Sequence, residues 1–297
     1  MKKVLVVGAT GLVGSRFVQL VKSELDIIAV DEKTLDITNS DAVNKYFNDN
    51  SFDSVINFAA VTNVDGAEKE RGDENGFTWK LNVVGPLNLA EVCLKHDRFL
   101  IQISTDFVFK GTENDPGPYS ENTPLPEENS GIGWYGWSKN RSEKLARESG
   151  ARFAVVRIAY PFYPSLYEAK LDFAKNYLKL FDEGKLFPIF TDQILSVLNV
   201  DDLVEPMTKI IDNELEGVFH LVSSDTTTPF DFVEYLLWKA RKVEGVVQKG
   251  SMTEFLKAEG RTPRPRLGGL QTKITEEKLG IKLPTWKEMI DEFVSKL

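Results

Sequence analysis

The sequence of 297 residues contains very little cysteine and histidine, and this scarcity excludes two kinds of site. Cys93 is the single cysteine, so the chain forms no internal disulfide, as expected of a protein that works in the reducing cytoplasm. His96 and His220 are the two histidines, too few for a zinc site of the Cys/His type. Because no carboxylate pattern indicates a metal site either, we expect no bound metal.

The sequence also lacks the features of membrane and nucleic-acid-binding proteins. No apolar run approaches the ~18 residues needed to cross a bilayer. Residues 1–7 place an apolar run after two lysines, but Gly8 interrupts it and no cleavage site follows, so we predict a strand and not a leader. With 45 acidic and 36 basic residues, the net charge of −9 repels a phosphate backbone. We therefore expect a cytoplasmic protein with neither a membrane nor a nucleic acid as partner.

Short apolar runs alternate with helix-like stretches through the first half of the chain. The run over residues 4–7 is continuously apolar, as in a strand that is buried on both faces. This alternation predicts an α/β fold with a doubly wound parallel sheet, the Rossmann architecture. The predicted strands cover residues 4–7, 27–30, 54–58, 99–104 and 153–158, and the predicted helices cover 13–23, 40–50, 82–95 and 136–148.

The pattern becomes irregular after Pro161. We therefore predict a Rossmann domain over residues 1–160 and a smaller lobe over 161–297, with some elements of the lobe returning to the main sheet. The elements predicted in this second part are helices over 169–182, 201–211 and 230–242, and extended segments over 186–190, 195–200 and 218–222. A loop marked by two prolines and two glycines, at 263, 265, 268 and 269, is predicted to precede terminal helices.

A glycine-rich turn follows the first predicted strand and opens the first predicted helix. Glycines at this position permit a tight turn and let a pyrophosphate approach the backbone, while the helix N-terminus offers free N–H groups. The spacing is G-x-x-G-x-x-G, and such a turn alone is weak evidence, since many strand–helix turns use glycine for geometry. The candidate residues for binding a dinucleotide here are Gly8, Thr10, Gly11, Leu12, Val13 and Gly14.

Asp31 strengthens the dinucleotide interpretation because it closes the second predicted strand, where a carboxylate can bond the adenosine ribose hydroxyls. The alternative is an ordinary solvated aspartate. Glu32 adjoins it, and two carboxylates disfavour the 2′-phosphate of NADPH, although Lys33 weakens the repulsion. We expect NADH or NADPH as cofactor, with NADH slightly favoured.

Two further segments complete the predicted cofactor site. Asp36 and Ile37 follow the loop after the second strand, where they can receive the adenine through the main chain and the Asp36 carboxylate. Ala59, Ala60 and Val61 follow the third strand, where small residues let the pyrophosphate and ribose lie close to the sheet.

Tyr135 and Lys139 are four residues apart and therefore share one face of a helix. A phenol with a pKa of about 10 is a poor base at neutral pH, and a nearby ammonium brings that pKa toward the working range. Tyr235 and Lys239 have the same spacing in an apolar helix, where packing explains them, so the spacing alone proves little. The first pair lies in the half of the chain that carries the glycine turn.

Ser104 and Thr105 end the fourth predicted strand, at the edge where open α/β sheets bind ligands. A hydroxyl there can hydrogen-bond a substrate carbonyl oxygen beside the tyrosine. The alternative role of these hydroxyls is to cap a helix or a turn.

Together these features resemble the short-chain dehydrogenase/reductase superfamily, in its extended nucleotide-sugar branch, and within it the dTDP-4-dehydrorhamnose reductase family. The resemblance keeps the order of the motifs nearly from end to end. The stretches that carry it are residues 8–14, 35–38, 57–65, 104–109, 135–139, 192–193, 217–221 and 264–283.

The resemblance implies an NAD(P)H-dependent reductase that acts on the 4-keto group of a dTDP-linked 6-deoxy sugar and yields dTDP-L-rhamnose. It implies a catalytic set of Thr105, Tyr135 and Lys139. The nicotinamide would deliver hydride to C4 while Tyr135 protonates the oxygen. Lys139 would lower the tyrosine pKa and hold the nicotinamide ribose, and Thr105 would hold the carbonyl oxygen.

The resemblance also implies substrate-binding residues. Asp106 would touch the sugar, while Arg264 and Arg266 would face the diphosphate unless they are surface arginines of a proline-stiffened loop. Tyr160 stands where the family usually has a tryptophan that meets the sugar, which puts the identity of the sugar in doubt. Residues 127–133 lengthen the segment before Tyr135 and could reshape the pocket.

Two other functions are compatible with the sequence. One is a nucleotide-sugar epimerase or dehydratase of the same superfamily, although no glutamate follows Asp106, as dehydratases generally need. The other is a non-catalytic, cofactor-binding regulatory subunit, like that of methionine adenosyltransferase. The sequence leaves the oligomeric state open, a homodimer included.

Overall fold

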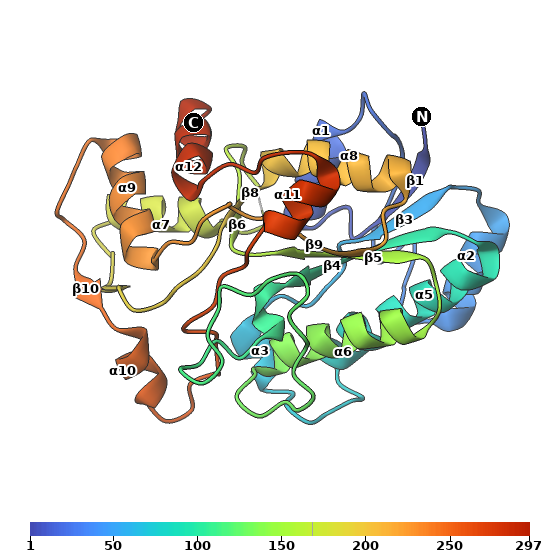
Figure 1. Cartoon of the computed structure of the whole chain (residues 1–297), viewed down its shortest axis with the longest axis horizontal. Coiled ribbons are helices and arrows are strands. Elements are labelled where there is room, and N and C mark those ends of the chain that lie inside the picture. The colour runs from blue at the N-terminus through green and yellow to red at the C-terminus, as the bar shows by residue number, and fades with distance from the viewer. Residues whose placement is uncertain (168) are drawn as a thin grey trace.

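A parallel sheet of six strands runs through the computed structural model, which describes residues 1–167 and 169–297. The strand order is β2-β1-β3-β4-β5-β9, and helices cover both faces (Figure 1). The prediction of a doubly wound α/β fold is therefore confirmed. The strands are β1 (Lys3–Val7), β2 (Asp26–Val30), β3 (Ser54–Asn57), β4 (Phe99–Thr105), β5 (Phe153–Ile158) and β9 (Gly217–His220).

The two faces of the sheet hold separate hydrophobic cores because successive strand side chains point to opposite sides. In β1, Val4 and Val6 join one core, and Leu5 and Val7 join the other. This explains why the strand is apolar at every position. The helices on the first face are α1 (Leu12–Leu20), α8 (Val204–Asn213) and α11 (Lys273–Leu279), and those on the second are α2 (Ser40–Asp49), α5 (Gly85–His96) and α6 (Trp134–Glu148).

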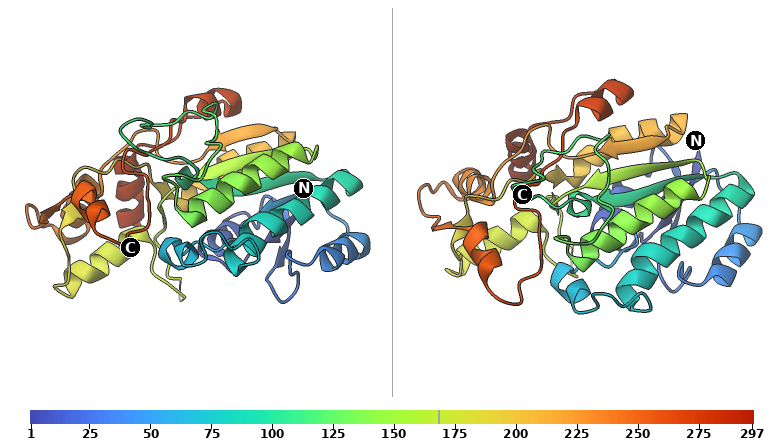
Figure 2. Two further views of the ribbon diagram at one scale, coloured as in Figure 1. Left: turned by 90° about the horizontal axis from the view of Figure 1, so that it is seen from below. Right: turned by 60° about the horizontal axis from the view of Figure 1, so that its bottom comes forward.

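A third core lies beyond the end of the sheet, in the part of the chain that follows β5 (Figure 2). Phe162 is at its centre, with its ring centroid 5.6 Å from that of Phe232 and 5.3 Å from that of Phe293. The surrounding elements are helices α7 (Phe173–Asp182), α9 (Pro229–Arg241) and α12 (Trp286–Ser295), the pair β6 (Pro161–Phe162) with β8 (Leu198–Asn199), and the pair β7 (Ile189–Phe190) with β10 (Lys249–Gly250).

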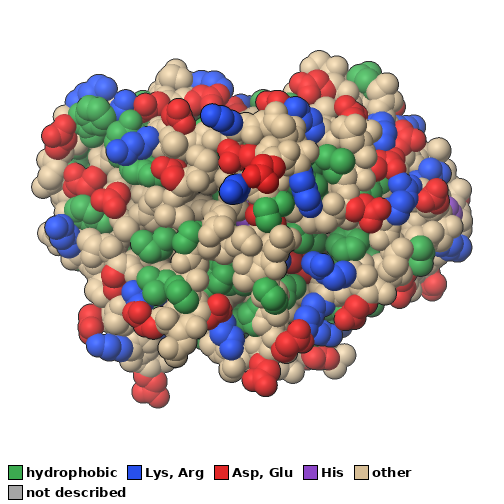
Figure 3. All heavy atoms as spheres, viewed as in Figure 1, with side chains coloured by type: hydrophobic (Ala, Val, Ile, Leu, Met, Phe, Trp, Pro, Cys, Tyr) green, Lys and Arg blue, Asp and Glu red, His purple; other side chains and the backbone are tan. Residues whose placement is uncertain are grey.

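β9 belongs to the later part of the chain, yet it pairs with β5 in the central sheet. A division into domains at residue 160 stays a prediction. Every helix within the described ranges is too short or too polar to cross a membrane. On the face seen in Figure 3, acidic and basic side chains are interspersed.

The observed elements differ from the predicted ones mainly at helix ends. The helix predicted to begin at residue 169 begins at Phe173, because the Asp172 carboxylate accepts a hydrogen bond of 2.9 Å from the Lys175 amide and caps the helix there. The helix predicted from residue 201 starts with a 3₁₀ turn, η3 (Val200–Leu203). Two short helices were not predicted, α3 (Val64–Glu68) and α10 (Met252–Lys257).

The helix predicted over residues 82–95 is longer and less regular than expected. It starts as α4 (Phe77–Trp79), widens into a π-helical turn, η1 (Lys80–Val84), and continues as α5. A π turn inside a helix is rare and is often found at a functional site. Here it places a buried polar residue, Asn82, beside the loop that follows β3.

Gly136 allows α6 to lie against the turn after β4. A Cβ atom at this position would overlap the carbonyl oxygen of Phe107. We expect Gly136→Ala to lower the free energy of unfolding by about 1–3 kcal/mol, because the helix must move away. Urea unfolding measures the loss. Ser142→Ala on the same helix is the control, since its buried hydroxyl has no hydrogen-bond partner among the described residues, and an equal loss in both variants would contradict the argument.

Candidate active site

The functional residues predicted from the sequence gather at the carboxyl ends of the parallel strands. Gly8 follows β1, Asp31 follows β2, Ala59 lies just beyond β3, and Asp106 follows β4. Parallel strands place all these ends at one edge of the sheet. β2 lies on one side of β1 and β3 lies on the other, so the order in which strands are added to the sheet reverses between β1 and β3. Ligands bind at such a switch point in open α/β sheets.

The glycine turn has the geometry that a dinucleotide needs. Gly8 has φ of +72°, and a Cβ on it would lie 2.5 Å from the Ala59 nitrogen. A Cβ on Gly14 would lie 2.5 Å from the Gly8 carbonyl oxygen, so larger residues would force strand and helix apart. Gly11 is the N-cap of α1 and has no side chain to cap it, which leaves first-turn N–H groups for a phosphate. These residues fit a dinucleotide cofactor.

The other residues predicted at this turn contribute main-chain groups. The Leu12 side chain is buried and Val13 packs against the same core, so neither side chain is free to bind. Thr10 is exposed, and its carbonyl oxygen accepts a hydrogen bond of 2.8 Å from the Tyr167 hydroxyl. The segment after β6 therefore reaches back to the glycine turn.

Asp31 and Asp36 each close a tight turn with a threonine. The Asp31 carboxylate accepts hydrogen bonds from the amide and hydroxyl of Thr34 at 2.9 and 2.7 Å, which lowers its pKa and keeps it charged. Asp36 accepts the same pair of bonds from Thr38. The Ile37 side chain is buried in the core, and its carbonyl oxygen accepts from the Asn88 amide at 2.8 Å. The roles of these residues toward a cofactor stay predictions.

Asn82 holds the loop after β3, a contact that was not predicted. Its side chain accepts from the Val61 amide at 2.8 Å and donates to the Val61 carbonyl oxygen at 3.1 Å. It also donates to the Ser138 hydroxyl at 2.9 Å, which joins the Ala59–Ala60–Val61 segment to α6. An asparagine in an otherwise apolar helical stretch was the signal in the sequence that could have identified it.

Tyr135 lies in the first turn of α6, and Lys139 follows one turn later. Lys139 is 2% exposed and Thr105 is 6% exposed, at the end of β4. The Thr105 hydroxyl donates to the Asp106 carboxylate at 3.1 Å, and it lies close enough to Tyr135 to influence the pKa of the phenol. The start of α6 is fixed by Glu68 of the unpredicted helix α3, which accepts from the Trp134 amide at 2.8 Å.

Burial controls the proton state of these groups. It raises the pKa of Tyr135 to about 12, although the neighbouring Thr105 acts in the opposite direction, and it lowers the pKa of Lys139 to about 8. The expectation that Lys139 brings the tyrosine pKa toward neutrality is thus wrong for this structure, because desolvation is the larger effect. A phenol that stays protonated at neutral pH is suited to donate a proton to an alkoxide, which is far more basic.

Asp106 faces three tyrosines. Burial raises the pKa of Tyr119, Tyr135 and Tyr160, and the Asp106 charge adds to each rise, so Asp106 lies near all three side chains. Asp106 itself is 2% exposed, and burial raises its pKa to about 7. It therefore carries a proton over part of the physiological pH range.

Tyr160 lies beside these groups in a strained conformation. Its φ is +42°, which is uncommon for a residue with a Cβ, and strained backbone of this kind often occurs at functional sites. Its hydroxyl accepts a hydrogen bond of 3.1 Å from Gln193, and its ring lies 6.2 Å from that of Phe107 and 4.9 Å from that of Phe173. Gln193 belongs to the motif that resembles the reductase family.

The two arginines of the proline-rich loop have different surroundings. Arg264 donates to both carboxylate oxygens of Asp65 at 2.6 and 2.7 Å. Burial raises the pKa of Tyr160 and the charge of Arg264 partly opposes this rise, so Arg264 lies near the site. Its buried Nε has no hydrogen-bond partner among the described residues. Arg266 instead pairs with Glu113 and donates to the Asp192 carbonyl oxygen at 3.2 Å. Binding of a diphosphate by either arginine stays a prediction.

The second tyrosine–lysine pair lies elsewhere, between α9 and α12. The Tyr235 hydroxyl donates to Asp291 at 3.0 Å, and the Lys239 ammonium pairs with the same carboxylate at 2.8 Å. The pair is held by this surface ion pair as well as by packing, and no glycine turn or strand end adjoins it.

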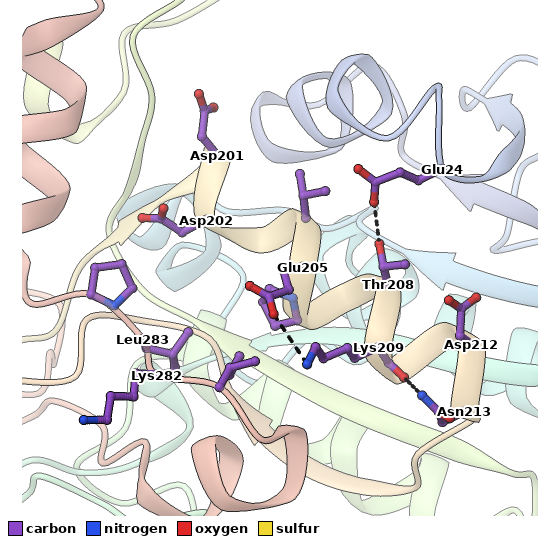
Figure 4. A pocket seen from close by; sticks show the side chains of 14 residues that line it. Glu24, Asp201, Asp202, Glu205, Thr208, Lys209, Asp212, Asn213, Lys282 and Leu283 are labelled. Carbon is purple, nitrogen blue, oxygen red and sulfur yellow. Dashed lines mark hydrogen bonds and ion pairs between the residues drawn. The ribbon is translucent and has the colours of Figure 1, made fainter.

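A separate hollow of about 650 Å³ lies along α8 (Figure 4). Four of its polar residues contact one another: Thr208 donates to Glu24 at 3.3 Å, and Lys209 pairs with Glu205 at 3.4 Å. Among residues 1–167 and 169–297, no group of three or more His, Cys, Asp or Glu is arranged to hold a metal ion. The hollow therefore adds no group to the site at the sheet edge.

The raised pKa of Asp106 makes stability depend on pH. Between about pH 4 and 7 the folded chain keeps the proton of Asp106 while the unfolded chain loses it. The contribution of Asp106 to the free energy of unfolding is therefore complete below about pH 4 and is lost as the pH rises through 7. We expect Asp106→Asn to remove this dependence, which amounts to about 4 kcal/mol at most. Urea unfolding at pH 4 and pH 8 measures it. Exposed Asp26→Asn is the control, and an unchanged slope in Asp106→Asn would contradict the assignment.

Comparison with known proteins agrees with this geometry. The family model described as RmlD substrate binding domain matches residues 1–297. The chain is 31% identical to dTDP-4-dehydrorhamnose reductase of Mycolicibacterium smegmatis over 77% of this chain and 67% of that protein. It is 27% identical to the spore coat polysaccharide biosynthesis protein SpsK of Bacillus subtilis over 100% of this chain and 98% of that one.

A solved structure is also similar over the whole chain. The dTDP-4-dehydrorhamnose reductase of Bacillus anthracis, in complex with NADP, superposes with a TM-score of 0.86 at 27% identity, covering 100% of this chain and 99% of that one. The resemblance drawn from the sequence motifs is confirmed: the chain belongs to the RmlD substrate-binding-domain family.

Proposed function

We propose that the chain is an NAD(P)H-dependent oxidoreductase that reduces the 4-keto group of a nucleotide-linked 6-deoxy sugar, as in dTDP-L-rhamnose synthesis. The observation that carries the proposal is the placement of Thr105, Tyr135 and Lys139 at the sheet edge that also holds the glycine turn. The names of its relatives, and the NADP bound in one solved neighbour, support the same reaction.

Each residue of the site has a separate role in the reaction. A reduced nicotinamide supplies the hydride that reaches C4 of the sugar. The Tyr135 hydroxyl gives its proton to the carbonyl oxygen, so that the ketone becomes an alcohol, and the Thr105 hydroxyl holds that oxygen in place. Lys139 is positioned one turn from Tyr135 to stabilise the phenolate left behind and to hold the nicotinamide ribose. The first turn of α1 binds the pyrophosphate.

The substrate residues are proposed from their position around Tyr135. Asp106 and Tyr160 face the sugar, and Arg264 is close enough to Tyr160 to affect its pKa. Its unpaired Nε is a donor available to the substrate diphosphate. Both arginines have a carboxylate partner, Asp65 for Arg264 and Glu113 for Arg266, so we assign the diphosphate first to Arg264 because of this additional donor.

The alternatives from the sequence remain less well supported. A dehydratase needs further acid groups, and the residue after Asp106 is Phe107. A regulatory subunit has no need of a protonated tyrosine beside Thr105. We also propose that the protein acts in the cytoplasm, which suits its single buried cysteine, and that a homodimer is its form in solution, to be tested by sedimentation.

Loss of the Tyr135 hydroxyl tests the reductase proposal. With dTDP-4-keto-6-deoxy-L-mannose, we expect the natural chain to oxidise NADH or NADPH, followed by absorbance. Tyr135→Phe should lower kcat by about 10²–10⁴-fold, because general acid catalysis contributes that much, and leave the Kd of the cofactor nearly unchanged. Tyr235→Phe, in the second pair, is the matched control and should keep full turnover.

Two outcomes would overturn the proposal. If the natural chain binds the cofactor but oxidises none with this sugar, the substrate is wrong. If Tyr135→Phe turns over as fast as Tyr235→Phe, the phenol is not the proton donor, and the regulatory alternative gains support.

The charge of Asp31 gives a second test, directed at the choice of cofactor. Two negative groups about 4 Å apart in water, such as the Asp31 carboxylate and the 2′-phosphate of NADPH, repel each other by about 1 kcal/mol. This energy corresponds to a roughly fivefold change in a binding constant. We expect the natural chain to prefer NADH, and Asp31→Asn to raise kcat/KM for NADPH relative to NADH by about fivefold. Asp41→Asn, an exposed carboxylate on α2, is the control. A natural chain that prefers NADPH would refute this assignment.

A further inference from the structure

A carboxylate and a guanidinium are buried together beside the catalytic residues, outside the set that the proposed reaction uses. Glu143 on α6 is 0% exposed and Arg157 on β5 is 1% exposed. Two hydrogen bonds join them, from Arg157 Nη2 to Glu143 Oε2 at 2.7 Å and from Nε to Oε1 at 3.0 Å. This bidentate geometry is the strongest form of such a pair.

Glu143 also binds the strand that ends in Thr105. The hydroxyl of Ser104, which is 3% exposed, donates to Glu143 Oε1. Ser104 immediately precedes Thr105 on β4, and Glu143 follows Lys139 by one helical turn on α6. A single carboxylate therefore connects the strand end of the catalytic site to the helix that carries its phenol and ammonium.

The other side of the pair reaches the edge strand of the sheet. Arg157 Nη1 lies 3.1 Å from His220 Nε2 on β9. Since arginine has donors alone, Nε2 must accept, so the proton of this imidazole is on Nδ1, which donates to the Gln271 carbonyl oxygen at 2.7 Å. Burial and the charge of Arg157 lower the pKa of His220 to about 3, so the ring stays neutral.

Such a network is costly to bury. Removing both charges from water cancels much of their attraction, and apolar residues of similar volume are often as stable in such positions. Apolar contacts are not directional, so they do not fix the orientation of one element relative to another. The hydrogen bonds of this network are directional, and they join α6, β4, β5 and β9. Its position directly behind Thr105 and Lys139 gives that rigidity a use.

We propose that Glu143 is a positioning residue for the reduction: through Ser104 and Arg157 it fixes the Thr105 hydroxyl relative to Tyr135 and Lys139. The proposal rests on the proposed function of this site. Catalysis depends on such alignment, because a misplacement of about 1 Å can cost about 10²-fold in rate. Glu143 itself acts through its neighbours and does not touch the reacting atoms.

Serine variants test this role without leaving a charge unpaired. Ser104→Ala removes the bond to Glu143 and leaves the ion pair intact. Ser142→Ala is the matched control, because Ser142 is also buried, on α6, and its hydroxyl has no partner among the described residues. We expect Ser104→Ala to lower kcat about tenfold or more with the KM for NADH within twofold, Ser142→Ala to keep kcat, and Ser104→Thr, which retains a hydroxyl, to recover most of it.

The results separate this proposal from the reductase proposal. A kcat of Ser104→Ala within twofold of the natural chain, or an equal loss in Ser142→Ala, would overturn the positioning role. If the natural chain oxidises no cofactor, the proposed function fails. The rate of amide hydrogen exchange at residues 104–106 then tests whether the bond from Ser104 to Glu143 holds the end of β4 in place. Faster exchange in Ser104→Ala than in Ser142→Ala supports the connection, and equal exchange overturns it.

Discussion

The burial of a parallel sheet on both faces is the constraint on which the site depends. Strands packed under helices on either side must be almost wholly apolar, so polar chemistry is confined to their ends or must be paired inside. The polar residues of the central strands follow this rule. Asn57 and Gln102 bond each other at 3.0 Å across β3 and β4, and Ser104 is satisfied by Glu143. The carboxyl ends then remain as the place where Thr105 can meet Tyr135.

The same burial sets the proton states of the site. Tyr135, Asp106 and Lys139 are all pushed toward their neutral forms, to pKa values of about 12, 7 and 8. A site of this kind holds protons on its phenol and has a carboxyl group that titrates near neutrality. Desolvation thus keeps the tyrosine protonated at neutral pH, which is the form that reduction of a ketone requires.

Most of the fold is predictable because it follows from patterns of residues that lie close together in the sequence. Mainly apolar runs predicted five strands of the sheet, and the ends of these strands in the structure differ from the prediction by one residue at most. The helix starts were less accurate where a distant or non-periodic signal decides them, as with the cap at Asp172. The π turn around Asn82 was missed because its cause is a contact with Val61 and Ser138, which periodicity does not report.

By itself the sequence determined the sheet architecture, the glycine turn and the shared face of Tyr135 and Lys139, since each depends on residues close together in the chain. The tertiary structure alone decided which polar groups meet across long separations. Arg264 pairs with Asp65 across 199 positions, and Arg157 meets His220 across 63. It also decided the pKa of Tyr135, because desolvation is a property of the surrounding packing and not of the spacing to one lysine.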